Sequence, residues 1–184
     1  MNVTETAIPG VVIIEPKLFG DSRGFFMELY QEDRYRGFAQ RFVQDNLSRS
    51  TRGVLRGLHF QNPKPQQKLV TVLRGSVLDV AVDVRAGSPT FGHHVAIELS
   101  EGNRRQLWVP SGFAHGFVVL SDTADFFYKC DQFYNPANEF VLRWNDKELG
   151  INWGCDSPTV SARDRKGVPL AQLMESLPRY EQDQ

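Results

Sequence analysis

Short apolar runs rich in strand-forming residues recur along most of this chain, spaced about ten residues apart. Gly, Pro, Ser or Asn separates one run from the next, as in tight turns. This rhythm favours a mostly β fold, a sandwich or a small barrel, over a helix bundle. The 15 Gly, 10 Pro and 13 Phe residues point the same way. We expect strands at 11–14, 54–60, 69–73, 77–84, 94–99, 105–109, 115–120, 124–130 and 139–144.

Helical signals are few and short. The strongest covers residues 31–42, a second covers residues 171–177, and residues 145–149 are typical of a short turn. The 184 residues contain no internal repeat and no linker. We therefore expect a single domain over residues 1–184, with a frayed polar tail at about residues 179–184.

The charges of the chain nearly cancel, with 21 Lys and Arg against 22 Asp and Glu and a net charge of −1. This balance argues against a protein that coats nucleic acid, yet it leaves room for a local basic pocket that binds one small anion. No apolar run is long enough for a signal peptide or a membrane span. We expect a cytoplasmic protein with no nucleic-acid or membrane partner, in which Cys130 and Cys155 are free thiols.

The predicted strand at 77–84 carries two carboxylates, Asp79 and Asp83. They are four residues apart, so their side chains share one face of a strand. That face is either the ligand-holding interior of a barrel or an outer face in solvent. Periodicity alone leaves both readings open.

Four histidines are candidates for chemistry. His93 and His94 are neighbours, which point to opposite faces of a strand, and we interpret them as surface or interface residues. His59 and His115 each stand in a predicted strand beside glycines. Two histidines on separate strands, without an HxH pair, are a poor ligand set for zinc, iron or manganese, so we expect no metal. The alternative is that both are hydrogen-bonded barrel residues without a chemical role.

Several spaced segments, taken in their order along the chain, are far more specific than any one of them. They are 19–26, 43–46, 54–61, 68–70, 88–92, 105–110, 128–130 and 161–164. Residues 110–115 also read PSGFAH, the PxGxxH pattern that in the cupin superfamily closes a turn and points a His into a small barrel. From about residue 5 to about residue 170 the chain resembles the dTDP-4-dehydrorhamnose 3,5-epimerase family. The resemblance implies a mostly β, cupin-type double-stranded β-helix (a jelly-roll barrel) with a few short helices.

The resemblance also implies a substrate, the dTDP-linked 4-keto-6-deoxyhexose dTDP-4-dehydro-6-deoxy-D-glucose. C3 and C5 of this sugar both lie next to the C4 ketone, so the same carbonyl acidifies both C–H bonds. Inversion requires a base on one face, an acid on the opposite face and a donor near the developing enolate, and it requires no cofactor. The implied product is dTDP-4-dehydro-L-rhamnose, which serves dTDP-L-rhamnose and polysaccharide biosynthesis.

Four residues match the catalytic positions of the family. His59 is the expected base, because a neutral imidazole accepts a proton well near pH 7, and Asp164 is expected to hold its tautomer. Tyr128 is the expected acid, and Lys68 the expected stabiliser of the enolate. Taken singly, each has an ordinary alternative: Asp164 as a turn or cap residue, Tyr128 as a packed aromatic, Lys68 as a solvated strand end.

The diphosphate requires guanidinium groups, whose planar fork matches phosphate oxygens. The resemblance implies that Tyr134 stacks on thymine and that His115 lies near the ketone or the sugar hydroxyls. It further implies a homodimer in which an N-terminal segment reaches the neighbour, so that Arg23 serves either its own site or the partner's. The residues expected to bind substrate are Arg23, Glu28, Gln44, Asp45, Asn46, Arg56, His115, Tyr134, Glu139 and Arg163.

Three other functions compete with a 3,5-epimerase. A sister enzyme that inverts only C3 or only C5 would keep the same base and acid. A metal-dependent cupin would contain stoichiometric iron, zinc or manganese. A non-catalytic sugar-nucleotide sensor would keep its function without His59 or Tyr128. Locating the deuterium that the 4-keto sugar takes up from heavy water, together with elemental analysis, separates these functions.

Overall fold

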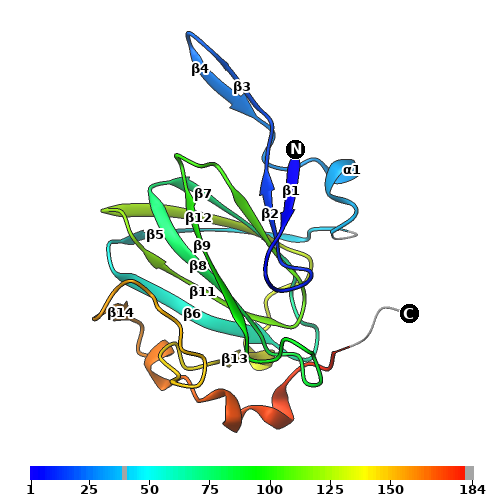
Figure 1. Ribbon diagram of the computed structural model, residues 1–184, viewed down its shortest axis with the longest axis vertical. Coiled ribbons are helices and arrows are strands. Elements are labelled where there is room, and N and C mark those ends of the chain that lie inside the picture. The colour runs from blue at the N-terminus through cyan, green and yellow to red at the C-terminus, as the bar shows by residue number, and fades with distance from the viewer. Residues whose placement is uncertain (39–40, 181–184) are drawn as a thin grey trace.

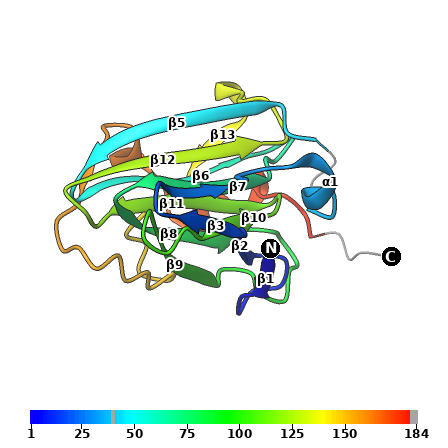
Figure 2. The same cartoon turned by 90° about the horizontal axis from the view of Figure 1, so that it is seen from above.

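Two β-sheets face each other in the computed structural model, which describes residues 1–38 and 41–180 (Figures 1 and 2). The first sheet contains, in order across it, β1 (Asn2–Glu5), β2 (Val12–Glu15), β10 (Gln106–Val109), β7 (Lys68–Arg74), β12 (Thr123–Cys130) and β5 (Gln44–Thr51). The second contains β13 (Glu139–Val141), β6 (Val54–Gln61), β11 (Phe113–Val119), β8 (Ser76–Asp83) and β9 (His94–Ser100), with β14 (Thr159–Val160) beside β6. A separate hairpin is formed by β3 (Leu18–Asp21) and β4 (Gly24–Met27). The prediction of a mostly β fold is confirmed.

The main core lies between the two sheets. Phe126 of β12 stacks on Phe117 of β11 with ring centroids 3.9 Å apart, and both side chains are buried. Val70 of β7 and Ala81 of β8 belong to the same cluster. The apolar residues come from alternate positions of each strand, which is the spacing that sends side chains to one face.

Part of each outer face of the sandwich is covered. On the first sheet, Phe38 and Phe42 pack on Trp108, with ring centroids 5.5 Å and 6.0 Å away. On the second sheet, Trp153 and Leu177 from the C-terminal third belong to the cluster that covers it. The short helices of the described chain are α1 (Glu32–Tyr35) and the 3-10 turns η1 (Pro136–Asn138), η2 (Asp164–Lys166), η3 (Leu170–Gln172) and η4 (Met174–Ser176).

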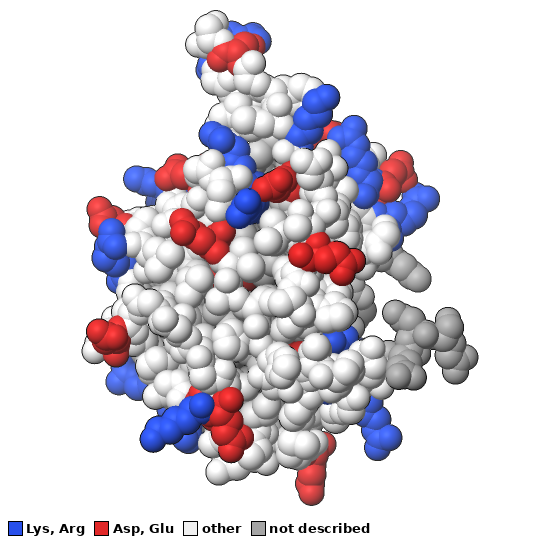
Figure 3. All heavy atoms as spheres, in the orientation of Figure 1, with Lys and Arg blue, Asp and Glu red and all other residues white. Residues whose placement is uncertain are grey.

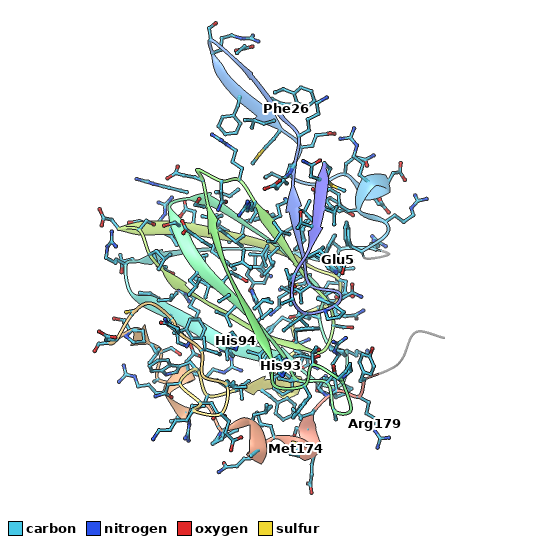
Figure 4. All side chains as sticks on the ribbon, viewed as in Figure 1. Glu5, Phe26, His93, His94, Met174 and Arg179 are labelled. Carbon is cyan, nitrogen blue, oxygen red and sulfur yellow. The ribbon has the colours of Figure 1, made fainter. Side chains whose placement is uncertain are left out.

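The predicted strands are present, with ends shifted by a few residues. Four strand segments are absent from the prediction: β1, β14, β5 and the β3–β4 hairpin. β5 consists of Gln44–Thr51, a largely polar run whose inner face is polar as well, so it shows no apolar alternation. The β3–β4 hairpin is apolar but exposed, and it projects away from the sheets (Figure 1). Phe26 stands on this arm (Figure 4) and is 64% exposed.

Three predictions about the helices and the tail are wrong in extent. The helix expected at 31–42 is α-helical only at Glu32–Tyr35. Gly37, a poor helix former, follows it, and the aromatic residues after it pack on Trp108 instead of continuing the helix. Residues 39–40 lie outside the described residues. The helix expected at 171–177 is two 3-10 turns.

The predicted fraying of residues 179–184 is wrong at its start. Arg179 forms a bridge with Ala86, and the backbone N–H of Tyr180 donates to the Ala86 carbonyl oxygen at 3.0 Å. These bonds tie the chain to the segment after β8. Residues 181–184 lie outside the described residues.

The polar face of β8 points into the protein, so the solvent-facing alternative is wrong. Asp79 is fully buried, and one of its carboxylate oxygens lies 2.8 Å from Nε2 of His115. Asp83 is also fully buried and accepts hydrogen bonds from Arg85 and from the hydroxyl of Ser88.

Acidic and basic side chains are interspersed over the face shown in Figure 3, as a nearly neutral composition predicts. Cys130 and Cys155 are free, as expected. His93 and His94 lie at the start of β9 (Figure 4), and His93 is exposed. Among the helices of the described residues, none has the length and apolar character needed to cross a membrane.

Candidate active site

A cavity of about 580 Å³ lies between the two sheets. Strands β5, β7 and β12 of the first sheet and β6 and β11 of the second contribute to it, and residues 159–164 close one side. Its volume is in the range of small-molecule sites. Eight of the predicted site residues line it: Asn46, Arg56, His59, Lys68, His115, Tyr128, Arg163 and Asp164.

Two glycines allow the strands that carry the histidines to approach closely. His59 of β6 and His115 of β11 are Cα partners across the antiparallel ladder. Beside them, a Cβ on Gly116 would lie 2.6 Å from the backbone oxygen of Arg56, and a Cβ on Gly57 would lie 2.6 Å from Cα of Gly116. The backbone of Gly57 also has φ of +119°, a conformation that side chains disfavour. These glycines therefore permit the pairing that places both imidazoles in one cavity.

His59 is paired with a buried carboxylate. Its Nε2 lies 2.7 Å from Oδ1 of Asp164, and Asp164 is only 3% exposed. Burial alone raises the pKa of Asp164, but hydrogen bonds with His59 and Ser161 outweigh it, so this pKa lies below its usual value. An ionised Asp164 accepts the Nε2–H of His59, which leaves Nδ1 as the proton-accepting nitrogen. Asp164 does begin η2, but its carboxylate is occupied by the imidazole rather than by a cap.

Tyr128 and Lys68 reach the cavity from the opposite sheet. Burial raises the pKa of Tyr128 to about 12, so its phenol is protonated at neutral pH and can donate. The Lys68 ammonium lies 6.0 Å from the centroid of the Tyr128 ring. Burial lowers the pKa of Lys68, as for an amine held out of bulk water. Lys68 is thus the first residue of β7 and yet a cavity residue, not a solvated strand end.

His115 forms a second imidazole–carboxylate pair, with Asp79. The distance from Nε2 of His115 to the two carboxylate oxygens is 2.8 Å and 3.0 Å, and the His115 ring stacks on Phe126. The sequence interpretation did not assign Asp79 to the site, although its inward face was one of the readings left open. Across the described ranges, no three His, Cys, Asp or Glu side chains are grouped so that they could hold a metal ion.

Three predicted substrate-binding residues, Tyr134, Glu139 and Arg163, form a group that we call the mouth cluster. The Tyr134 hydroxyl donates to Oε2 of Glu139 at 2.7 Å, and the Arg163 guanidinium pairs with the same oxygen. Arg163 also donates to the Tyr134 hydroxyl at 3.2 Å. Gln44 accepts from the backbone N–H of Tyr134 at 2.9 Å and donates to Asn46 at 3.0 Å. Gln44 therefore joins the mouth cluster to the cavity wall.

Three other predicted binding residues belong neither to the cavity lining nor to the mouth cluster. Asp45 is turned away from it, because neighbours in a strand alternate in direction, and the Lys129 ammonium donates to its carboxylate at 2.7 Å. Glu28 pairs with Arg34 near the base of the arm. Arg23 stands at the turn of the projecting β3–β4 hairpin, with its side chain 88% exposed.

The cavity carries an imidazole and a phenol on opposing walls. His59 belongs to the second sheet and Tyr128 to the first, so a ligand between the sheets meets the imidazole on one face and the phenol on the other. Arg56, whose Nε donates to Ser50 at 3.0 Å, adds a guanidinium to the lining. This arrangement suits removal of a proton from carbon on one face and return of a proton on the other.

Comparisons with known proteins agree with this chemistry. The family model described as dTDP-4-dehydrorhamnose 3,5-epimerase matches residues 5–172. A protein of that name from Pseudomonas aeruginosa is 53% identical over 175 residues, covering 93% of this chain and 97% of the relative. A crystal structure of dTDP-6-deoxy-D-glucose-3,5-epimerase from Legionella pneumophila, in complex with dTDP-4-keto-L-rhamnose, has a TM-score of 0.95 and 50% identity, covering 98% of this chain and 99% of that one. A 3'-monoepimerase from Streptomyces bikiniensis, in complex with dTDP-quinovose, has a TM-score of 0.90 and 34% identity, covering 95% and 92%.

Proposed function

This chain belongs to the dTDP-4-dehydrorhamnose 3,5-epimerase family, and from that premise we propose the reaction its cavity performs. The protein is an isomerase that inverts C3 and C5 of dTDP-4-dehydro-6-deoxy-D-glucose to give dTDP-4-dehydro-L-rhamnose. Its fold is the cupin-type jelly roll expected for that family. It acts as a single domain, in the cytoplasm, and supplies dTDP-L-rhamnose biosynthesis.

One observation carries the proposal: His59 and Tyr128 occupy opposing walls of one cavity. Nδ1 of His59 takes the proton from the carbon next to the ketone, and Asp164 stabilises the resulting imidazolium through Nε2. Lys68 donates to the developing enolate oxygen. Tyr128 returns a proton from the other face, which inverts the carbon. No step in this sequence requires a redox cofactor.

Other residues in and around the cavity hold the nucleotide and the sugar. Arg56 and Arg163 supply guanidinium groups for the diphosphate. Tyr134 supplies a ring at the cavity edge for thymine, fixed by its bond from the backbone to Gln44. His115 faces the sugar, held by Asp79.

A homodimer accounts for the projecting arm. The β3–β4 hairpin exposes Phe25 and Phe26, at 55% and 64%, and an aromatic arm of this kind is a surface that a second copy would cover. In the proposed dimer the arm crosses to the neighbour and carries Arg23 to the neighbour's diphosphate, with Glu28 at its base. Arg23 is then free to leave its exposed pairing with Asp21, which contributes little.

Deuterium incorporation tests the reaction. The purified protein is incubated with dTDP-4-dehydro-6-deoxy-D-glucose in heavy water, and the labelled carbons are located by NMR. We expect deuterium at both C3 and C5 with formation of the L-rhamnose configuration. Deuterium at only one carbon would replace the proposal with a single-carbon epimerase. Stoichiometric iron, zinc or manganese in the active protein would argue for metal chemistry instead.

A further inference from the structure

The second ring nitrogen of His59 faces another carboxylate. Nδ1 lies 3.7 Å from Oε1 of Glu139, whose side chain is only 9% exposed. The strand register explains this placement. Val141 of β13 is the Cα partner of His59, and Glu139 is the partner of Gln61, so Glu139 lies on the same face and diagonal to the imidazole. The base therefore stands between Asp164 on one nitrogen and Glu139 on the other.

The mouth cluster holds Glu139 back from His59. Its Oε2 is bonded to the Tyr134 hydroxyl at 2.7 Å and paired with the Arg163 guanidinium. The 3.7 Å separation from the imidazole is too long for a hydrogen bond but short for an interaction between charges. While Arg163 is paired with Glu139, its positive charge opposes the effect of the carboxylate's negative charge on His59.

We propose that Glu139 is a positioning residue that couples diphosphate binding to the proton affinity of His59. This inference rests on the proposed function. A substrate diphosphate attracts the Arg163 guanidinium, which leaves the negative charge of Glu139 uncompensated beside Nδ1. That charge favours the imidazolium, so His59 is a stronger base when the nucleotide is bound than when the site is empty. Besides Asp164, Glu139, Arg163 and Tyr134, the ionisable groups around this space are Lys68, His115, Tyr128 and Arg56.

The pH dependence of kcat/KM in Glu139→Gln and Arg163→Gln tests the proposal, because the two variants break the same ion pair from opposite ends. Removing the carboxylate disfavours the imidazolium, so the acid limb should move to lower pH by up to about one unit. Removing the guanidinium should move it to higher pH. Glu98→Gln, which removes an exposed carboxylate from β9, should leave the profile unchanged. Thermal melts and dTDP binding confirm that each variant is folded.

Calorimetry of dTDP binding supplies a second readout that does not depend on turnover. Measured near the acid limb in buffers of different ionisation enthalpy, it reports the protons taken up on binding. The wild-type protein should take up more than Glu139→Gln, because in the variant Arg163 moves to the diphosphate without exposing a charge beside His59.

Two results would overturn the coupling. One is movement of both acid limbs in the same direction, or of neither. The other is a Glu139→Gln variant in which only KM and the dTDP dissociation constant rise, while proton uptake matches the wild type; Glu139 would then be a nucleotide ligand alone. A wild-type protein that exchanges no substrate protons would overturn the proposed function itself, which is a separate result.

Discussion

A methyl group added at Gly116 should damage both stability and turnover. The Cβ of Gly116→Ala would lie 2.6 Å from the backbone oxygen of Arg56, and ordinary contact begins at 3.4 Å. Both are backbone positions of paired strands, so β6 and β11 must separate. Overpacking of this kind costs about 1–3 kcal/mol. Alanine also lowers the conformational entropy of the unfolded chain, which offsets about 0.4–1 kcal/mol of this destabilisation.

The midpoints of these ranges give a net loss of about 1.3 kcal/mol, which corresponds to a fall in melting temperature of about 3–5 °C for a chain of this size. His59 and His115 are partners in the displaced ladder, so kcat should also fall, by about 10- to 100-fold for a shift approaching 1 Å. Calorimetry and an epimerisation assay measure the two effects. Gly102→Ala is the matched control, since its Cβ meets only a serine oxygen at 3.6 Å. If Gly116→Ala has the same melting temperature and the same kcat as Gly102→Ala, the reasoning from the close approach of β6 and β11 is refuted.

Three further predictions concern the reaction, the acid range and the arm. His59→Ala should abolish deuterium exchange at C3 and C5, whereas Tyr128→Phe should permit exchange and impair completed inversion; full turnover by Tyr128→Phe would remove its role as the acid. The pKa of Asp164 is lowered in the folded protein, so its ionisation stabilises the fold above the ordinary value of 3.8, and this stabilisation is lost as the pH falls through the lowered value. Urea unfolding of Asp164→Asn between about pH 5 and pH 2 should therefore show a weaker loss of stability on acidification than the wild type, and equal losses would contradict the assignment. Phe26→Asp, on the exposed arm, should leave the fold intact but shift light scattering from dimer to monomer; a variant that remains dimeric would place the interface elsewhere.

Strands that bury apolar residues were predictable from the sequence, and polar ones were not. The runs containing Val70 and Phe117 show apolar alternation because one face enters the core. The strand Gln44–Thr51 was not predicted, because its inner face lines a polar cavity and its outer face meets solvent. The sequence therefore lacks the alternation of apolar and polar residues that marks a half-buried strand. Residues 31–42 show the opposite error, because a helix was predicted where most of the segment is not helical. The spacing of their apolar residues resembles that of a helix, but the aromatic side chains pack over Trp108.

Site residues that belong to a recognisable motif could be predicted from the sequence. Hydrogen-bond partners that lie far apart in the sequence could not be predicted from the local pattern. Asp164 lies 105 residues from His59, and the resemblance, not the local pattern, identified it. Asp79 gave a signal, an acidic residue inside an apolar strand, but nothing in the sequence tied it to His115. Asp45 was placed in the site by its motif, although alternation along a strand already separates it from its two neighbours.

Because the β3–β4 arm crosses to the neighbour, each catalytic centre of the proposed dimer contains residues from both chains. Arg23→Ala and His59→Ala subunits would each be inactive alone, because every site in either homodimer lacks one essential group. Mixing them produces heterodimers in which one site has lost both groups and the other has kept both. Random reassortment would therefore restore about a quarter of the wild-type activity per site. Two defective alleles expressed together could complement each other, and the recovered fraction would report directly on how the subunits share their sites.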